Sequence, residues 1–138
     1  MRILGLDIGD RRIGMALSDP SGLLATPKGF IKRSNYEKDI VRICNITIDE
    51  GVQRIVAGMP LSLNGRKGPQ ARMVDDFVGA LRYQSSVPVE TWDERYSTQD
   101  AERMLRQAGH KPSRERGLVD SAAAAVILQW YLDSQPNT

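Results

Sequence analysis

The hydrophobic pattern of the chain changes period near residue 33, and this change limits the possible folds more than any other feature. Before it, residues 2–8, 12–18 and 23–32 read as extended segments between turn signals, which is typical of antiparallel hairpins. After it, helical spacing over 34–51 and from 69 onward alternates with short apolar strands at 52–58 and 87–92. We therefore expect an α/β fold: a five-stranded mixed sheet, three antiparallel strands followed by two parallel ones, with helices on both faces.

Local signals place the helix boundaries and one sheet edge. Ser34 and Glu37 have the spacing of a capping box, and Pro69 suits the first position of the second helix. Pro27 predicts that the third strand is an edge or carries a bulge. A third helix is expected to open at Ser97, and a last one to span about 117–132 before a frayed tail at 134–138. The apolar face of the first helix is expected to comprise Ile40, Ile43, Cys44, Thr47 and Ile48.

The length and composition exclude several classes of protein. With 138 residues the chain is expected to form a single domain, 1–138. Cys44 is the lone cysteine and His110 the lone histidine, so an internal disulfide and a multi-histidine metal site are impossible. No apolar run approaches a membrane span and the N-terminus lacks a signal-peptide cleavage site, so we expect a cytoplasmic protein. Cys44, on an apolar helical face, is interpreted as a small buried residue and not a nucleophile.

Carboxylates occur where apolar residues would be expected. Asp7 interrupts the first apolar strand, and Asp120 leads directly into four alanines of the last helix. The pair Asp93 and Glu94 ends the fifth strand. Each has a structural alternative: Asp7 as a turn cap, Asp120 as a helix N-terminal charge, and the pair as polar strand-end residues. If they converge, their oxygens suit hard ions such as Mg²⁺ or Mn²⁺, and two such ions can promote phosphodiester hydrolysis.

Positive charge is localised although the whole chain carries only +2. Residues 103–116 contain five basic side chains and one acid, which could hold a phosphate backbone near Asp120. Arg11, Arg12 and Arg95 neighbour the candidate acids and could contact the scissile phosphate. No stripe of alternating basic and aromatic residues is evident, which favours recognition of backbone and shape over base stacking. Further candidate substrate-binding residues are Arg66, Lys67, Arg114 and Arg116.

Four separated blocks of sequence resemble the YqgF/RuvX family. They are DIGDRRIGMALSD (7–19), VAGMPLSLNGRKG (56–68), DERYSTQDAE (93–102) and VDSAAAAVILQWYL (119–132). The family has a ribonuclease H-like fold, and its members are described as Holliday junction resolvases and as nucleases that mature the 5′ end of pre-16S ribosomal RNA. The resemblance covers almost the whole chain. It implies a metal-dependent phosphodiesterase whose acidic triad falls on Asp7, Glu94 and Asp120, which would also bind Mg²⁺ or Mn²⁺. Strand alternation lets only one of Asp93 and Glu94 face the site, and Glu94 is preferred.

Three functions remain open on the sequence. An endonuclease acting on structured RNA, with pre-16S rRNA on the ribosome as the first candidate, or on branched DNA explains the acids and the basic connector together. A small-molecule phosphotransferase would share the Asp-x-Gly element, but such enzymes close two domains around ATP and this chain supplies one. A non-catalytic nucleic-acid-binding module would not need all three acids. The oligomeric state is expected to be a monomer or a homodimer, the latter if a four-way junction is the substrate.

Overall fold

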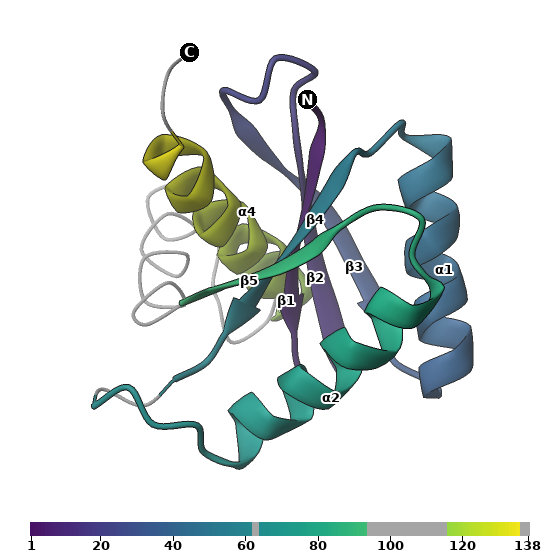
Figure 1. Cartoon of the computed structure of the whole chain (residues 1–138), viewed down its shortest axis with the longest axis vertical. Coiled ribbons are helices and arrows are strands. Elements are labelled where there is room, and N and C mark those ends of the chain that lie inside the picture. Colours follow the sequence, from purple (N-terminus) through teal and green to yellow (C-terminus); the bar gives the residue numbers. More distant parts are fainter. Residues whose placement is uncertain (62–63, 94–115, 136–138) are drawn as a thin grey trace.

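A five-stranded mixed sheet forms the centre of the protein, as the sequence predicts (Figure 1). The computed structural model describes residues 1–61, 64–93 and 116–135. The spatial order is β3-β2-β1-β4-β5, with β1 antiparallel to β2, β2 antiparallel to β3, and β4 parallel to both β1 and β5. The elements are β1 (Ile3–Ile8), β2 (Arg12–Ser18), β3 (Ala25–Lys32), α1 (Tyr36–Asp49), β4 (Arg54–Met59), α2 (Pro69–Gln84), β5 (Val89–Asp93) and α4 (Arg116–Ser134). The helix expected to open at Ser97 falls outside the described residues.

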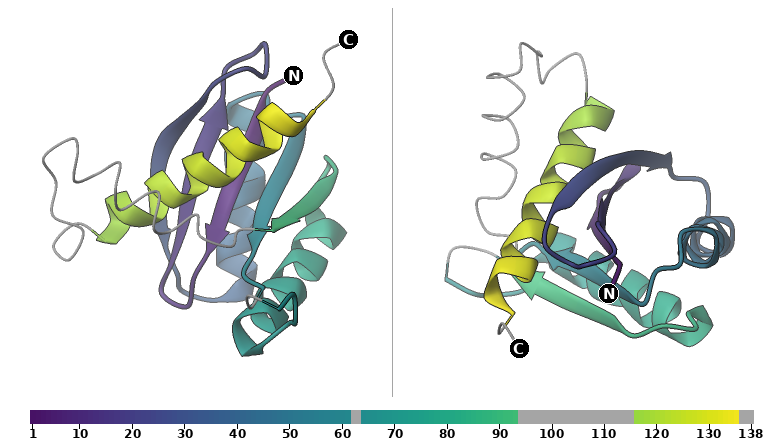
Figure 2. Two further views of the ribbon diagram at one scale, coloured as in Figure 1. Left: turned by 90° about the vertical axis from the view of Figure 1, so that its left-hand side faces the viewer. Right: turned by 90° about the horizontal axis from the view of Figure 1, so that it is seen from above.

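Helices cover both faces of the sheet, which confirms the predicted layering. The views of Figure 2 show α1 and α2 on one face and α4 crossing the other. Strand alternation divides the core accordingly. Leu4, Leu6 and Ile8 of β1 belong to the core under α1 and α2, whereas Ile3 belongs to the core under α4. Side chains of β1 at odd positions, Asp7 included, therefore face α4.

The edge position of β3 also agrees with the sequence. β3 is the outer strand next to β2, and Pro27 lies within it. The register shifts between Met15 and Ala16 of β2, because Met15 pairs with Gly29 while Ala16 pairs with Pro27. Gly29 has a φ of 103°, in the left-handed region that glycine adopts without strain. The bulge that Pro27 suggested is therefore present.

Two details of α1 differ from the prediction. The N-cap is Asn35 and not Ser34: the Asn35 side chain accepts a hydrogen bond of 2.9 Å from the backbone N–H of Lys38. Ile48 is 71% exposed and does not belong to the apolar face. At about 100° per residue it lies roughly 80° around the helix from Ile40. The buried stripe instead runs through Ile40, Ile43 and Thr47.

A buried ion pair connects α1 to the turn that follows β1. The Arg33 guanidinium donates to the carboxylate of Asp39 at 3.3 Å and to the carbonyl of Gly9 at 3.0 Å, and the Asp39 side chain is only 1% exposed. Arg33 also lies over the rings of Tyr36 and Phe77, with its Cζ 5.5 and 5.0 Å from their centroids. The pair therefore fixes the turn at residues 9–11, which directly follows Asp7.

Replacing Asp39 with asparagine is expected to lower the free energy of unfolding by about 2 kcal/mol, because Arg33 then stays buried beside a neutral acceptor. Chemical denaturation would measure the loss. Asp49→Asn, an exposed carboxylate on the same helix, is the control and should change stability by less than about 0.5 kcal/mol. Equal stabilities for the two variants would contradict this account of the pair.

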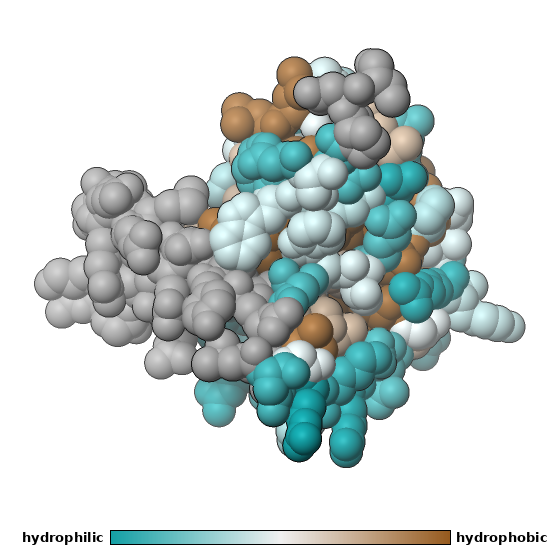
Figure 3. Space-filling model, turned by 60° about the vertical axis from the view of Figure 1, so that its left-hand side comes forward, coloured by the Kyte–Doolittle hydropathy of each residue, from teal (hydrophilic) through white to brown (hydrophobic). Residues whose placement is uncertain are grey.

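The surface differs between the two ends of the sheet. In Figure 3 hydrophilic residues cover the lower end of the molecule, where β1 and β4 end and α2 begins. Exposed residues at that end include Asn64, Arg66, Lys67 and Arg72. At the opposite end Leu23 and Leu24, in the turn between β2 and β3, are 69% and 63% exposed. Within the described ranges, none of the helices has the length and apolar character needed to cross a bilayer.

Candidate active site

The carboxyl ends of three parallel strands meet at one edge of the sheet. β1, β4 and β5 run in the same direction and end at Ile8, Met59 and Asp93. In α/β sheets this edge is where ligand sites form. Asp7 and Asp93 both lie in the last two residues of their strands, so the backbone brings two of the predicted acidic positions to the same edge.

Asp7 lies in a row of residues that crosses the whole sheet on the face covered by α4. Asp7 pairs with Gly14 of β2, and Gly14 pairs with Phe30 of β3. On the other side, Leu6 of β1 pairs with Ala57 of β4, so the next residues along, Asp7 and Gly58, lie side by side. Gly58 in turn pairs with Trp92 of β5. The only carboxylate in this row therefore has a glycine as its neighbour on either side. Neither neighbouring strand position supplies a side chain that could cover it.

The N-terminal part of α4 packs directly on this row. A Cβ placed on Gly14 would lie 2.0 Å from the backbone carbonyl oxygen of Asp120, so only glycine allows this approach. Further along, a Cβ on Gly5 would lie 2.9 Å from the Cβ of Leu128. Asp120 thus lies over Gly14, the pairing partner of Asp7. Two acids separated by 113 positions in the chain are brought to adjacent positions in the fold.

The carboxylate of Asp120 is engaged by Arg12. The Nε of Arg12 donates to its Oδ2 at 2.7 Å, and both side chains are 26% exposed. Arg12 is the first residue of β2 and lies two positions before Gly14, on the same face. The sequence predicts that Arg12 contacts a substrate phosphate; in the structure its guanidinium pairs with a candidate catalytic acid. An Arg–carboxylate pair at this distance also fixes the orientation of the Asp120 side chain.

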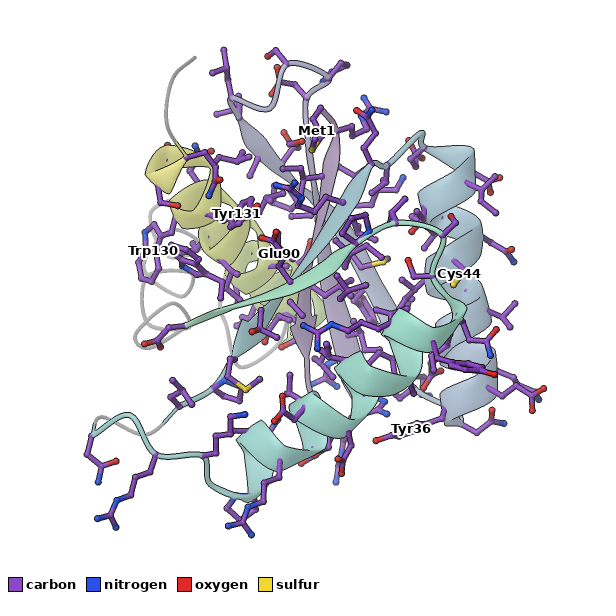
Figure 4. All side chains as sticks on the ribbon, in the orientation of Figure 1. Met1, Tyr36, Cys44, Glu90, Trp130 and Tyr131 are labelled. Atoms are coloured by element: carbon purple, nitrogen blue, oxygen red, sulfur yellow. The ribbon has the colours of Figure 1, made fainter. Side chains whose placement is uncertain are left out.

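The C-terminal half of α4 is anchored to β4 and β5 by Tyr131. Figure 4 shows Tyr131 beside Glu90, to which its hydroxyl donates at 2.8 Å. The hydroxyl also accepts from Arg54 at 2.7 Å, and the ring contacts Trp92 edge to face with 5.7 Å between the ring centroids. Burial, followed by the hydrogen bond to Glu90, raises the pKa of the Tyr131 hydroxyl. Tyr131 therefore stays protonated and serves as a core residue. Trp130 is partly buried and packs on α4 itself.

Strand alternation assigns Asp93 to the opposite face. In β5, Glu90 and Trp92 contact α4, while Val89 belongs to the core under α1 and α2. Asp93 has the parity of Val89 and therefore lies on the face away from Asp7. Glu94, the preferred third acid, is outside the described residues.

The candidate basic residues divide into three groups. Arg11 and Arg12 line an open hollow of about 510 Å³ beside the site. Arg66 and Lys67 lie in the loop between β4 and α2, where Lys67 pairs with Asp75 at 2.6 Å. Arg95 and Arg114 lie outside the described residues, and Arg116 begins α4 with no side chain described.

The roles of several residues do not follow from the sequence. Arg33 reads as one more surface cation, yet its charge is buried with Asp39. Gly14 reads as an ordinary strand glycine, and only its proximity to α4 explains it. One signal was available: Asp39 is an acid that directly precedes Ile40, the first residue of the apolar face of the helix.

A second hollow lies away from the acids. It measures about 640 Å³ between α1 and α2, and its lining includes Tyr36, Cys44 and Tyr83. Figure 4 shows Tyr36 and Cys44 on α1, on the side of the sheet away from Tyr131. Cys44 is expected from the sequence to be buried; it is partly buried and packs against the core under α1 and α2. Burial raises the pKa of its thiol, which keeps it protonated.

Comparison with known proteins identifies the family. A family model described as "RuvX: Holliday junction resolvase" matches residues 1–134. The chain belongs to the RuvX family. A protein of Desulforudis audaxviator (strain MP104C) named "Putative pre-16S rRNA nuclease" is 48% identical over 137 residues, covering 99% of this chain and 97% of that protein. A protein of the same name from Symbiobacterium thermophilum is 47% identical, covering 98% and 94%.

Solved structures confirm the ribonuclease H-like fold of this RuvX family member. RuvC of Thermus thermophilus superimposes with a TM-score of 0.60 at 17% identity, covering 96% of each chain. The Holliday junction resolvase of fowlpox virus gives 0.61 at 17% identity, covering 98% of this chain and all of that one. At these identities the likeness concerns the fold.

In the described part of this RuvX chain, no group of three or more His, Cys, Asp or Glu side chains is arranged to hold a metal ion. Two of the three acids that the resemblance implies, Asp7 and Asp120, are within that part. Asp7 belongs to that row of the sheet, and Asp120 lies over the row from α4, on the same face. The third falls beyond residue 93, where the description of β5 ends.

Proposed function

We propose that the chain is a divalent-metal-dependent endonuclease that hydrolyses phosphodiester bonds in structured RNA and processes the 5′ end of pre-16S rRNA on the ribosome, in the cytoplasm. The observation that carries the proposal is the convergence of Asp7 and Asp120 on one face of the sheet, in a chain that belongs to a nuclease family. The names of the two relatives described above support rRNA as the substrate.

The residues present fit a hard divalent cation. Asp7 and Asp120 supply carboxylate oxygens, the donors that Mg²⁺ and Mn²⁺ prefer, and the glycines beside Asp7 leave its face of the sheet uncovered by neighbouring strand side chains. Glu94 is proposed as the third ligand, and the parity of β5 supports it over Asp93. When bound, such ions activate a water molecule and stabilise the leaving oxygen of a phosphodiester.

The protein's own cations orient the substrate. Arg12 offsets the charge of Asp120 in the free protein, and in the complex its guanidinium would share the phosphate near the acids. Arg11 and the loop residues Arg66 and Lys67 lie at the same end of the sheet and would bind flanking phosphates. Arg95, Arg114 and Arg116 are proposed to do the same from the segment that leads into α4.

A Holliday junction resolvase is the second candidate function. The description of the family model supports it, and so does the fold shared with resolvases, one of them solved with a Holliday junction substrate. Such an activity would require two sites, and therefore a homodimer.

One assay separates these functions. The purified protein is offered a pre-16S rRNA fragment with its 5′ extension and a four-way DNA junction side by side, with Mg²⁺, with Mn²⁺ and with a chelator. We expect metal-dependent cleavage of the RNA at least about tenfold faster than that of the junction. Faster symmetrical cutting of the junction would favour the resolvase, and no cleavage of either substrate under any condition would contradict the proposal.

A further inference from the structure

An exposed aromatic side chain lies in the same row of the sheet as Asp7. Phe30 pairs with Gly14, the residue under Asp120, and its side chain is 45% exposed. Its neighbour Ile31 points to the other face and is 1% exposed, so Ile31 supplies the core contact of this segment. Phe30 therefore presents its ring to solvent on the α4 face, beside the candidate active site.

Cations surround this ring. The open hollow of about 510 Å³ is lined by Phe30 together with Asp10, Arg11, Arg12, Lys32 and Arg33. Arg12 and Arg33 are paired with Asp120 and Asp39, whereas Arg11 and Lys32 are exposed. Lys32 pairs with Arg12 across the strands, which puts it on the same face as Phe30. The hollow thus combines an exposed ring with a net positive rim.

This combination is the chemistry that binds an unpaired nucleotide. A base stacks on an aromatic face whatever its sequence, and its phosphates are held by Lys and Arg. A duplex buries its base faces, so it could use the cations but not the ring. The sequence pattern did not reveal this surface because the exposure of Phe30 depends on the edge position of β3.

We propose that Phe30 stacks the base of an unpaired nucleotide next to the scissile phosphate, and that Arg11 and Lys32 bind the phosphates on either side of it. The inference rests on the proposed nuclease function and deepens it: the substrate is single-stranded on the β3 side of the site. Phe30 lies two strands from Asp7, about 10 Å at the usual strand spacing.

Binding measurements in chelator test the proposal without cleavage. A fluorescein-labelled 12-nucleotide single-stranded RNA of mixed sequence and a blunt duplex containing it are titrated with the full chain and with Phe30→Ala, Phe30→Leu and Phe30→Trp. The alanine variant is expected to bind the single strand about tenfold more weakly and the duplex less than twofold more weakly. Tryptophan should restore or exceed the original affinity, and leucine should not.

A matched control is available on helix α2. Tyr83 of α2 is 87% exposed and lies away from the hollow, so Tyr83→Ala should leave both affinities unchanged. Lys32→Ala should remove one phosphate contact. The slope of log affinity against log salt concentration should then fall in magnitude by about one. Thermal melting checks that each Phe30 variant is folded, and the leucine variant keeps an apolar side chain if alanine is not tolerated.

Unchanged single-strand affinity in Phe30→Ala would overturn the inference, as would equal losses on single strand and duplex or full rescue by leucine. None of these results would affect the nuclease proposal, which is tested by cleavage. Conversely, wild-type protein that stacks RNA but cuts neither substrate would contradict the nuclease function and leave the stacking surface in place.

Discussion

Asp7→Asn is expected to reduce metal-dependent cleavage by at least about 1000-fold while the protein stays folded. Asparagine has nearly the same shape but carries no charge, so it holds a divalent cation poorly. Loss of several kcal/mol of metal-ion stabilisation corresponds to a rate loss of this size, at 1.36 kcal/mol for each factor of ten. Initial rates on the better of the two substrates, at saturating Mg²⁺ and again at saturating Mn²⁺, would measure the effect.

The control for Asp7→Asn is Asp76→Asn. Asp76 is an exposed carboxylate of α2, on the other face of the sheet, and its replacement should leave the rate within about twofold. Thermal melting of both variants would verify that the loss of activity is not a loss of fold. A rate for Asp7→Asn within tenfold of the original protein would contradict the proposed role of Asp7.

Asp120→Asn should lose as much activity as Asp7→Asn, but it should also lower the stability of the protein. It also removes the ion pair with Arg12, so its unfolding must be measured beside its rate. The effects of residues that act as one unit on the rate do not multiply. The double variant Asp7→Asn, Asp120→Asn should therefore cleave within a few-fold of the rate of the slower single variant. Multiplied losses would indicate that the two acids act independently.

A non-catalytic nucleic-acid-binding module predicts a different pattern. Binding would then be the same in chelator and in Mg²⁺, and no variant would alter a covalent step. The comparison of binding in the two conditions therefore separates docking from catalysis without the cleavage assay.

The order and type of the described elements could be predicted because each rests on a local pattern. Extended segments between turn signals indicated β1 and β2, and helical spacing indicated α1 and α2. Asp7 was recognisable because an acid within an apolar strand is costly without a partner. The boundaries were less accurate where two local signals competed: Ser34 and Asn35 can both cap a helix, and Asn35 does so because Ser34 instead donates to the buried Asp39.

The site itself could be predicted only in part because it depends on tertiary contacts. Nothing local to Arg12 indicates that it binds Asp120, 108 positions away. The face of Asp93 was left open by the sequence and is decided by Trp92, whose contact with Tyr131 fixes the parity of β5. Likewise, the exposure of Phe30 follows from β3 being at the edge.

Gly14→Ala is expected to have the largest effect on stability. The added Cβ would lie 2.0 Å from the carbonyl oxygen of Asp120 and 2.9 Å from the backbone nitrogen of Ser121, and neither backbone atom can move without shifting α4. Overpacking against backbone in a close helix–sheet contact should lower the free energy of unfolding by at least about 3 kcal/mol. Thermal and chemical denaturation would measure it, with a decrease of about 10 °C in the melting temperature.

The same substitution at Gly79 provides the matched control. Gly79 is exposed within α2, and a Cβ there would contact nothing within 4 Å. Gly79→Ala should therefore stabilise the protein by up to about 1 kcal/mol, since alanine favours a helix over glycine. Both variants add one methyl group. If the free energy of unfolding falls for Gly14→Ala and rises for Gly79→Ala, the loss is due to the close approach of α4 and not to the methyl group itself. If Gly14→Ala were as stable as the original protein, α4 could not lie on the row of Asp7, and the proximity of Asp7 to Asp120 on which the nuclease site depends would be lost.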